Sequence, residues 1–153
     1  MLQVCRPQDI FNCDETALLW RCVPDRSLSS RSISGRKKDK ARITAHLCSN
    51  SDGSERLPIL FNGGAKSPRA LRAAGIKIDN LNVKWRANKK AWMTSEIMEE
   101  WLRWFDSRMR GRKVILLMDT SSTAKILTST TPLKIQWLFG SRLMRQVLIS
   151  QWI

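Results

Sequence analysis

The chain has 153 residues, of which 42% are hydrophobic, enough for the core of one domain of ordinary size. It carries 27 Lys and Arg residues against 13 Asp and Glu, which gives a formal net charge of +14. This excess favours nucleic acid as the partner, although a basic protein with an acidic protein partner is the alternative. The longest apolar run, residues 114–118, is too short to cross a membrane.

The first segments predict strand structure followed by a basic arm. Residues 9–23 predict two short strands joined at a tight polar turn, or one long interrupted strand. They include two adjacent carboxylates, Asp14 and Glu15, and a buried carboxylate is costly unless another group pairs with it. Residues 26–42 are polar and basic, which predicts a loop or an arm that connects two strands.

The next segments predict a β-hairpin. Residues 43–49 alternate between apolar and polar side chains, and residues 56–61 form a second strand-like run. The turn-forming sequence of residues 50–53, NSDG, separates the two runs. Pro58 favours an edge position for the second strand, because proline cannot donate a ladder hydrogen bond. Residues 62–92 are mixed in character and predict irregular structure with short elements.

Residues 95–110 give the clearest helix signal of the chain. Thr94 is the predicted N-cap, Glu96 lies in the first turn where the helix dipole favours an acid, and Gly111 is the predicted stop. Apolar side chains recur at intervals of three and four residues, which predicts one broad buried face. These side chains are Ile97, Met98, Trp101, Leu102, Phe105 and Met109.

The last third of the chain predicts two strands and a final helix. Residues 113–119 contain five consecutive apolar residues before Asp119, which predicts a strand buried on both faces. A Ser/Thr-rich loop, residues 120–132, follows, and residues 133–138 predict another strand. Residues 141–152 have the apolar spacing of a short amphipathic helix.

The cysteines and the single histidine, His46, do not form a zinc-binding pattern. None of the four cysteines is paired at C-x-x-C spacing, and a zinc site needs four nitrogen or sulfur ligands at suitable spacing. We therefore expect reduced thiols in an intracellular protein.

Asp14 and Asp119 both lie on segments that are predicted to be strands. Functional groups of open α/β sheets gather where strands end, so the two aspartates converge if their strands are neighbours. Paired carboxylates repel each other unless a divalent cation such as Mg²⁺ neutralises them, and two such ions assist phosphodiester chemistry. The alternative is ordinary capping, in which Asp14 caps a turn and Asp119 caps the Ser-rich loop.

Four stretches of the sequence carry a resemblance to a known family. "FNCDETALLW", "SNSDGSERLPILFNGG", "RANKKAWMTSEIMEEWLRWFD" and "KVILLMD" resemble, in this order, the DDE superfamily endonuclease domain of pogo/Tigger-type transposases. Centromere-protein-B and jerky relatives share this domain. The resemblance covers about residues 9–138, residues 139–153 form a divergent tail, and we expect residues 1–153 to be a single domain.

The resemblance implies an α/β fold: a ribonuclease-H-like mixed sheet of five strands with flanking helices, here incomplete at the C-terminal end. It also implies three acidic residues that bind two Mg²⁺ ions for hydrolysis and strand transfer. The first acid corresponds to Asp14 and the second to Asp119. Glu15, as the next residue on the strand, points to the opposite face. Trp92, Trp101 and the apolar helix face are expected to pack against the sheet.

The sequence also departs from the family pattern. The family has a third acid after the 133–138 strand, but no Asp or Glu follows Asp119 in this chain. The helix-turn-helix modules usual upstream in the family are also missing, so we expect a domain truncated at both ends. Two acids would hold one Mg²⁺ weakly and would not fix a second ion. The candidates for a substitute carboxylate are Glu15, Glu96, Glu99 and Glu100.

Binding to DNA needs positive charge more than catalytic geometry. A solvated loop is the alternative for the arm, and its run GRKKDK also resembles a nuclear import signal, which favours a location in the nucleus. The candidate contacts are Arg36, Lys37, Lys38, Lys40, Arg42, Arg86, Lys89 and Lys90.

Three hypotheses about function follow. The first is a DDE transposase-derived domain that binds nucleic acid and lacks catalytic activity because the third acid is missing. The second is an active metal-dependent DNA endonuclease that uses a substitute carboxylate. The third is a non-enzymatic domain that acts through protein contacts.

Overall fold

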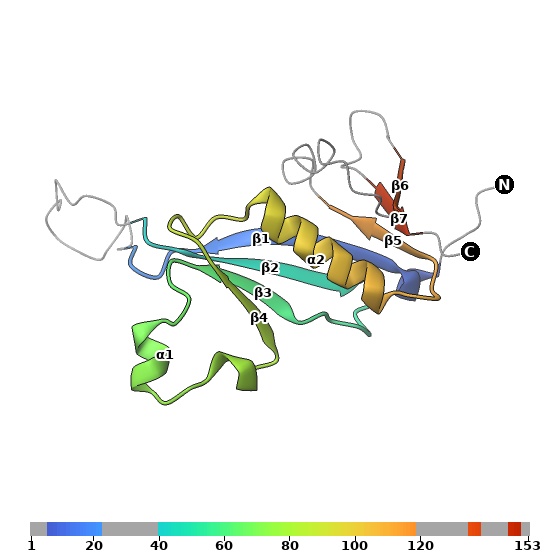
Figure 1. Ribbon diagram of the computed structural model, residues 1–153. Helices are drawn as coiled ribbons and strands as arrows, with labels where there is room; N and C mark the ends of the chain where they lie inside the picture. The colour runs from blue at the N-terminus through green and yellow to red at the C-terminus, as the bar shows by residue number, and fades with distance from the viewer. Residues whose placement is uncertain (1–5, 23–39, 119–134, 139–146, 151–153) are drawn as a thin grey trace, which may run out of the picture.

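The computed structural model describes residues 6–22, 40–118, 135–138 and 147–150 (Figure 1). A long helix packs on one face of a mixed sheet, and a 3-10 turn precedes both the first and the fourth strand. The elements are, in chain order, a 3-10 turn (Pro7–Asp9), β1 (Ile10–Leu18), β2 (Ile43–Asn50), β3 (Ile59–Gly63), α1 (Arg69–Ala73), a 3-10 turn (Ile78–Asn80), β4 (Val83–Ala87), α2 (Ser95–Arg108), β5 (Val114–Leu117), β6 (Ile135–Leu138) and β7 (Val147–Ser150).

The described strands form one sheet in the order β4-β3-β2-β1-β5-β7-β6. β1 is antiparallel to β2 and parallel to β5, whereas β3 is antiparallel to β2 and parallel to β4. The strands from β4 to β5 in this order make a mixed sheet of five, and the antiparallel pair of β7 and β6 continues it beyond β5. The predicted α/β class, consistent with a ribonuclease-H-like fold, is confirmed.

β1 is one strand, so the alternative of two short strands is wrong. It pairs with β2 from Phe11 opposite Asn50 to Leu18 opposite Ile43. Its side chains alternate between the two faces of the sheet, as strand geometry requires. Phe11 and Cys13 are buried, whereas Asn12 and Asp14 are exposed.

The predicted hairpin of β2 and β3 is confirmed, and its turn has the expected chemistry. Asp52 accepts hydrogen bonds from the backbone N–H and the hydroxyl of Ser54, and Gly53 has a φ of +74°, which favours glycine. The predicted edge position of the second strand is wrong, because β3 lies between β2 and β4. Pro58 precedes the first residue of β3, so it removes no donor from the ladder.

Helix α2 confirms the periodicity and the predicted cap. The hydroxyl oxygen of Thr94 accepts a hydrogen bond from the backbone N–H of Ile97, and Gly111, beyond the end of the helix, has a φ of +81°. The helix lies along one face of the sheet (Figure 1), and its apolar side packs on strands β1, β2, β3 and β5. The shared core includes Phe11, Cys13, Cys48, Leu60, Met98, Trp101, Leu102, Phe105, Met109, Val114 and Leu116.

Two further predictions are corrected, and two are confirmed. Residues 62–92 were predicted to be irregular with short elements, and they contain the short elements α1 and β4. The strand predicted at 113–119 to be buried on both faces is buried on one: Val114 and Leu116 of β5 are buried, and its other two residues are half-buried. Residues 147–150 form strand β7 between β5 and β6, not the predicted helix of 141–152. The strand predicted at 133–138 is confirmed as β6, and the loop predicted at 120–132 lies outside the described residues.

Candidate nucleic-acid interface and acidic position

Asp14 lies on β1 with its side chain on the face of the sheet opposite α2. Its neighbour Cys13 is 3% exposed and belongs to the core under the helix, whereas Asp14 is exposed. Asp14 stands across from Leu47 of β2, and its Oδ1 accepts a hydrogen bond of 2.7 Å from the backbone N–H of Glu15. The carboxylate therefore faces solvent. The free-energy cost of burying an unpaired carboxylate, considered above from the sequence, does not apply to Asp14.

The strand that leads to Asp119 is the parallel neighbour of β1. Ile10 pairs with Ile115, Phe11 with Leu116 and Asn12 with Leu117. The carboxyl ends of parallel neighbouring strands lie at the same end of a sheet. The condition for Asp14 and Asp119 to converge, that their strands are neighbours, is therefore met by β1 and β5. Asp119 itself lies outside the described residues.

Three of the four carboxylates considered as substitutes lie on α2 and have other roles there. Glu99 pairs with Arg103 one turn along the helix, at 2.6 Å, and Glu100 pairs with Arg86 of β4. Glu96 is exposed in the first turn, where its pKa is lowered by hydrogen bonding with Thr94. Within the residues that the structure describes, no three His, Cys, Asp or Glu side chains are grouped so that they could hold a metal ion.

Behind Asp14, the core contains ionisable groups that are kept neutral. His46 is 2% exposed, its ring lies edge-on to Trp101 with centroids 4.4 Å apart, and burial lowers its pKa to about 4. Cys13 stands across from Cys48 on β2. Its pKa is raised well above the usual value, mainly by hydrogen bonding with Cys48 and secondly by burial. These side chains suit a dry core, and both cysteines are free thiols, as predicted.

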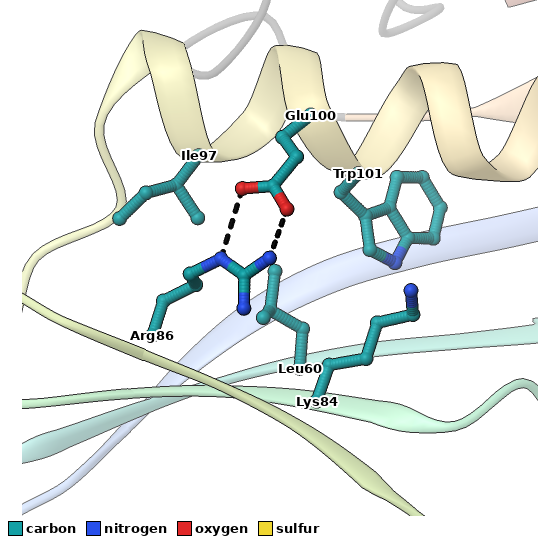
Figure 2. Close-up of a pocket in the computed structure, with 6 residues that line it drawn as sticks. All are labelled: Leu60, Lys84, Arg86, Ile97, Glu100 and Trp101. Atoms are coloured by element: carbon teal, nitrogen blue, oxygen red, sulfur yellow. Dashed lines mark hydrogen bonds and ion pairs between the residues drawn. The ribbon is translucent and has the colours of Figure 1, made fainter. Parts of the chain in front are cut away.

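Arg86, one of the predicted DNA contacts, already has an acidic partner. Figure 2 shows its guanidinium facing the carboxylate of Glu100, with two hydrogen bonds between them; the one from Nε measures 2.9 Å. This pairing raises the pKa of Arg86 and lowers that of Glu100. Arg86 therefore joins β4 to α2, and its charge is largely compensated. The shallow pocket beside the pair is lined by Leu60, Lys84, Arg86, Ile97, Glu100 and Trp101 (Figure 2).

The other predicted contacts fall into two groups. Arg36, Lys37 and Lys38 lie outside the described residues. Lys40 is exposed just before β2, and Lys89 and Lys90 are exposed in the loop between β4 and α2. Arg42 is half-buried, and its guanidinium lies over the ring of Trp92. The structure thus brings Arg42 and Lys90 together at one end of the sheet, around an aromatic ring.

Trp92 was predicted to pack against the sheet, and this prediction is wrong. The residue is 51% exposed, whereas Trp101, nine positions later, is 2% exposed and belongs to the core as predicted. The signal that could have found Trp92 was local: in the run KKAW, two lysines stand directly before an aromatic residue. Basic residues next to an exposed aromatic ring are typical of nucleic-acid-binding surfaces.

The fold and the acidic position together are those of a class, the ribonuclease-H-like domains with acids on or just after neighbouring strands. An acidic residue lies exposed on the first strand of a mixed α/β sheet of ribonuclease-H-like type, and the parallel neighbouring strand leads to a second acid in the sequence. Among the described residues, none of the helices has the length and apolar character needed to cross a membrane.

The family comparison agrees with this class. Residues 40–138 match the DDE superfamily endonuclease family, and the chain belongs to it. The match includes strands β2 to β6 and both described α-helices.

Several known proteins resemble the chain over most of its length. It is 51% identical over 113 residues to CENP-B homolog protein 2 of Schizosaccharomyces pombe, covering 74% of this chain and 22% of that protein. It is 53% identical over 112 residues to ARS-binding protein 1 of the same organism, covering 73% and 22%. Tigger transposable element-derived protein 4 of Mus musculus is 38% identical over 118 residues, with coverage of 74% and 22%. The chain thus spans about a fifth of the length of these relatives. No solved structure matches it.

Proposed function

We propose that this chain is a nucleic-acid-binding domain derived from a DDE transposase, and that residues 1–153 form a single domain. The observation that carries the proposal is the family match over residues 40–138 in a chain with a net charge of +14. A strongly positive surface field attracts polyanions, and the substrate of a DDE endonuclease is DNA. Because the relatives are much longer, the domain is one part of what such proteins contain.

Asp14 and Asp119 are the acids through which this domain would hold Mg²⁺. Asn12 pairs with Leu117, and each aspartate follows its member of that pair by two positions, which supports their convergence. Mg²⁺ prefers carboxylate and water oxygens in octahedral geometry, and an exposed Asp14 leaves room for those waters. When bound, divalent ions neutralise charge on the oxygens of a phosphodiester under attack. The chain would contribute Asp14 from β1 and Asp119 from two positions beyond the end of β5, the parallel neighbour of β1.

Two acids do not complete the site of a DDE enzyme, so the chain alone does not cleave DNA. No Asp or Glu follows Asp119 in the sequence, and Glu99 and Glu100 are held in ion pairs on α2. Without a third acid, a second ion is not fixed, and one of the two reacting phosphoryl oxygens keeps its developing charge.

A cleavage assay tests this loss of activity. Supercoiled plasmid is incubated with the chain and Mg²⁺ or Mn²⁺, and nicked product is compared between the wild type and Asp14→Asn. The expected result is no nicking above the level of the variant. Nicking by the wild type that disappears in Asp14→Asn would overturn the proposal in favour of an active endonuclease that uses a substitute carboxylate.

The DNA contacts are proposed at Lys40, Arg42, Lys89 and Lys90, with the run of Arg36, Lys37 and Lys38 contributing charge from the same arm. The first four are exposed or half-buried in the described part of the chain. Arg86 contributes least, because Glu100 already occupies its guanidinium. Since the partner is DNA and the arm is basic, we also propose that the protein is located in the nucleus.

Salt dependence tests the binding. The affinity for a labelled duplex is measured by fluorescence anisotropy from about 50 mM to about 200 mM salt, over which phosphate-based binding weakens steeply. The expected result is a linear fall of log affinity with log salt, with a smaller slope in the double variant Lys89→Gln, Lys90→Gln. Arg86→Gln is the matched control and should leave the slope nearly unchanged. An affinity that does not respond to salt would favour the alternative of a protein-interaction domain.

A further inference from the structure

The loop between β4 and α2 exposes a tryptophan flanked by two cations. The indole of Trp92 is 51% exposed. The guanidinium carbon of Arg42 lies 4.9 Å from the ring centroid, and the ammonium nitrogen of Lys90 lies 5.5 Å from it. Contacts of this geometry hold a cation over the aromatic face, so a base that stacks on the ring displaces a cation toward its own phosphates.

The backbone that carries Trp92 is held by two asparagine side chains. The Oδ1 of Asn88 accepts hydrogen bonds from the backbone N–H groups of Lys90, at 3.2 Å, and Trp92, at 3.1 Å. The carbonyl oxygen of Trp92 accepts from the Nδ2 of Asn88, at 2.6 Å, and from the Nδ2 of Asn62, which is fully buried. Both polar groups of the Trp92 backbone are therefore fixed by side chains from β3 and from the loop itself.

The residue before Trp92 is fixed as well, in an uncommon conformation. Ala91 has a φ of +52°, which residues other than glycine rarely adopt, and it is 3% exposed. Its carbonyl oxygen accepts a hydrogen bond of 2.7 Å from the hydroxyl of Thr44 on β2. Such backbone strain persists only where the surrounding contacts enforce it, and it occurs often at binding sites. Here the contacts bury Ala91 and leave the indole of Trp92 outside.

The chemistry of this surface selects its ligand. An aromatic ring with adjacent positive charges suits a nucleobase, which stacks on the ring, together with its phosphates, which pair with the cations. Within a duplex the bases stack on each other and do not offer a free face, whereas an unpaired base does. We propose that Trp92, flanked by Arg42 and Lys90, is a stacking platform for an unpaired base of single-stranded nucleic acid. This inference rests on the proposed nucleic-acid binding and names the site and the form of nucleic acid that it prefers.

The test compares single-stranded and duplex DNA. A labelled oligothymidine of about 12 nucleotides, within the site sizes typical of single-strand binders, and a duplex of the same length are titrated with the full chain. Trp92→Ala should weaken binding of the single strand about tenfold, as expected for the loss of one stacked base, and change duplex binding less than about twofold. Trp92→Phe, which keeps an aromatic ring, should recover most of the lost affinity.

Two further variants separate stacking from other effects. Leu81→Ala removes an apolar side chain of similar exposure (43%) before the other end of β4, and it should change neither affinity. The double variant Arg42→Gln, Lys90→Gln should weaken the binding of both single-stranded and duplex DNA. It should also reduce the slope of log affinity against log salt, because the two charges act on phosphates. Urea unfolding of each variant verifies that the fold is kept.

The outcomes distinguish this inference from the proposed function. If the chain binds duplex and single strand but Trp92→Ala changes neither, the stacking platform is wrong and the nucleic-acid-binding function stands. If Trp92→Ala weakens both forms equally, Trp92 does not select unpaired bases and the inference is also wrong. If the wild type binds neither form, the proposed function itself fails.

Discussion

The two faces of the sheet carry different kinds of residues, although the same strands supply both. Under α2, Phe11, Cys13 and His46 are at most 3% exposed and form part of one core. On the other face, Asp14 is exposed and its cross-strand neighbour Leu47 is 44% exposed. Because side chains alternate along a strand, neighbours such as Cys13 and Asp14 serve opposite surfaces. Substitutions one residue apart should therefore differ sharply in their effect on stability.

The largest effect is expected from Phe11→Ala. Phe11 is 0% exposed and packs edge-on against Phe105 of α2, with ring centroids 5.6 Å apart. Removing the ring leaves a cavity between β1 and the helix, which costs about 3–5 kcal/mol of unfolding free energy. Urea denaturation measures the change. The control is Leu47→Ala on the other face, which should cost about 1 kcal/mol or less; equal losses for the two would contradict the difference between the faces.

Acid should destabilise the face under α2 through His46. Burial lowers its pKa from the ordinary 6.5 to about 4, so unfolding takes up a proton between these pH values. The stabilising contribution is fully present above about pH 6.5 and is lost as the pH falls through about 4, a change of roughly 3 kcal/mol. Neither ring nitrogen has a hydrogen-bond partner among the described residues. His46→Leu therefore removes the proton uptake without leaving a buried donor or acceptor unpaired.

Urea unfolding at several pH values checks this prediction. The free energy of unfolding of the wild type should fall more steeply between about pH 6.5 and about pH 4 than that of His46→Leu. Asp14, whose negative charge opposes the lowering of the pKa of His46, provides a second check, because Asp14→Asn should shift the acid limb to slightly lower pH. Parallel pH profiles for the wild type and His46→Leu would mean that other groups govern acid stability.

The face under α2 is also the part that sequence patterns predict best. Residues of α2 recur at helical spacing, and Thr94 supplies a cap with its own local chemistry, so no distant contact is needed to identify the helix. β7 shows the opposite case. Residues 147–150 fit the apolar spacing of a helix, but their pairing with β5 and β6 decides in favour of a strand. Sheet pairing over long sequence distances is not visible in a local pattern.

The candidate site was predictable only in part, for a similar reason. Family-like residues around Asp14 predicted that it is the first acid, and the alternation of buried and exposed residues along the strand is observed. The run KKAW was the local signal for Trp92, but the hydrogen bonds that fix its backbone come from Thr44 and Asn62 on two other strands. Likewise, Arg86 is a free cation in the sequence, and its pairing with Glu100 appears only when β4 packs beside α2. Contacts between distant segments decided each of these residues.

Arg112 lies at one end of the sheet and belongs to neither of the two faces compared above. Its guanidinium contacts Asp9 at 3.1 Å and Glu55 at 2.9 Å, and so links the start of β1 to the hairpin of β2 and β3. The side chain is 38% exposed, so solvent and salt screen these pairs. Arg112→Gln should cost about 1 kcal/mol or less, and the loss should shrink in high salt. A loss that does not depend on salt would mean that the guanidinium acts by packing on Phe11, from whose ring it lies 5.8 Å.

The smallest effect on stability is expected from Asp14→Asn. The side chain is exposed, and its one described hydrogen bond, to the backbone N–H of Glu15, can also be accepted by an amide oxygen. The unfolding free energy should therefore change by less than about 0.5 kcal/mol without metal. With Mg²⁺ added, the wild type should gain stability in proportion to its weak binding, and the variant should not, because the proposed ligand is neutral. A wild type and an Asp14→Asn variant that respond equally to Mg²⁺ would remove Asp14 from the proposed metal site.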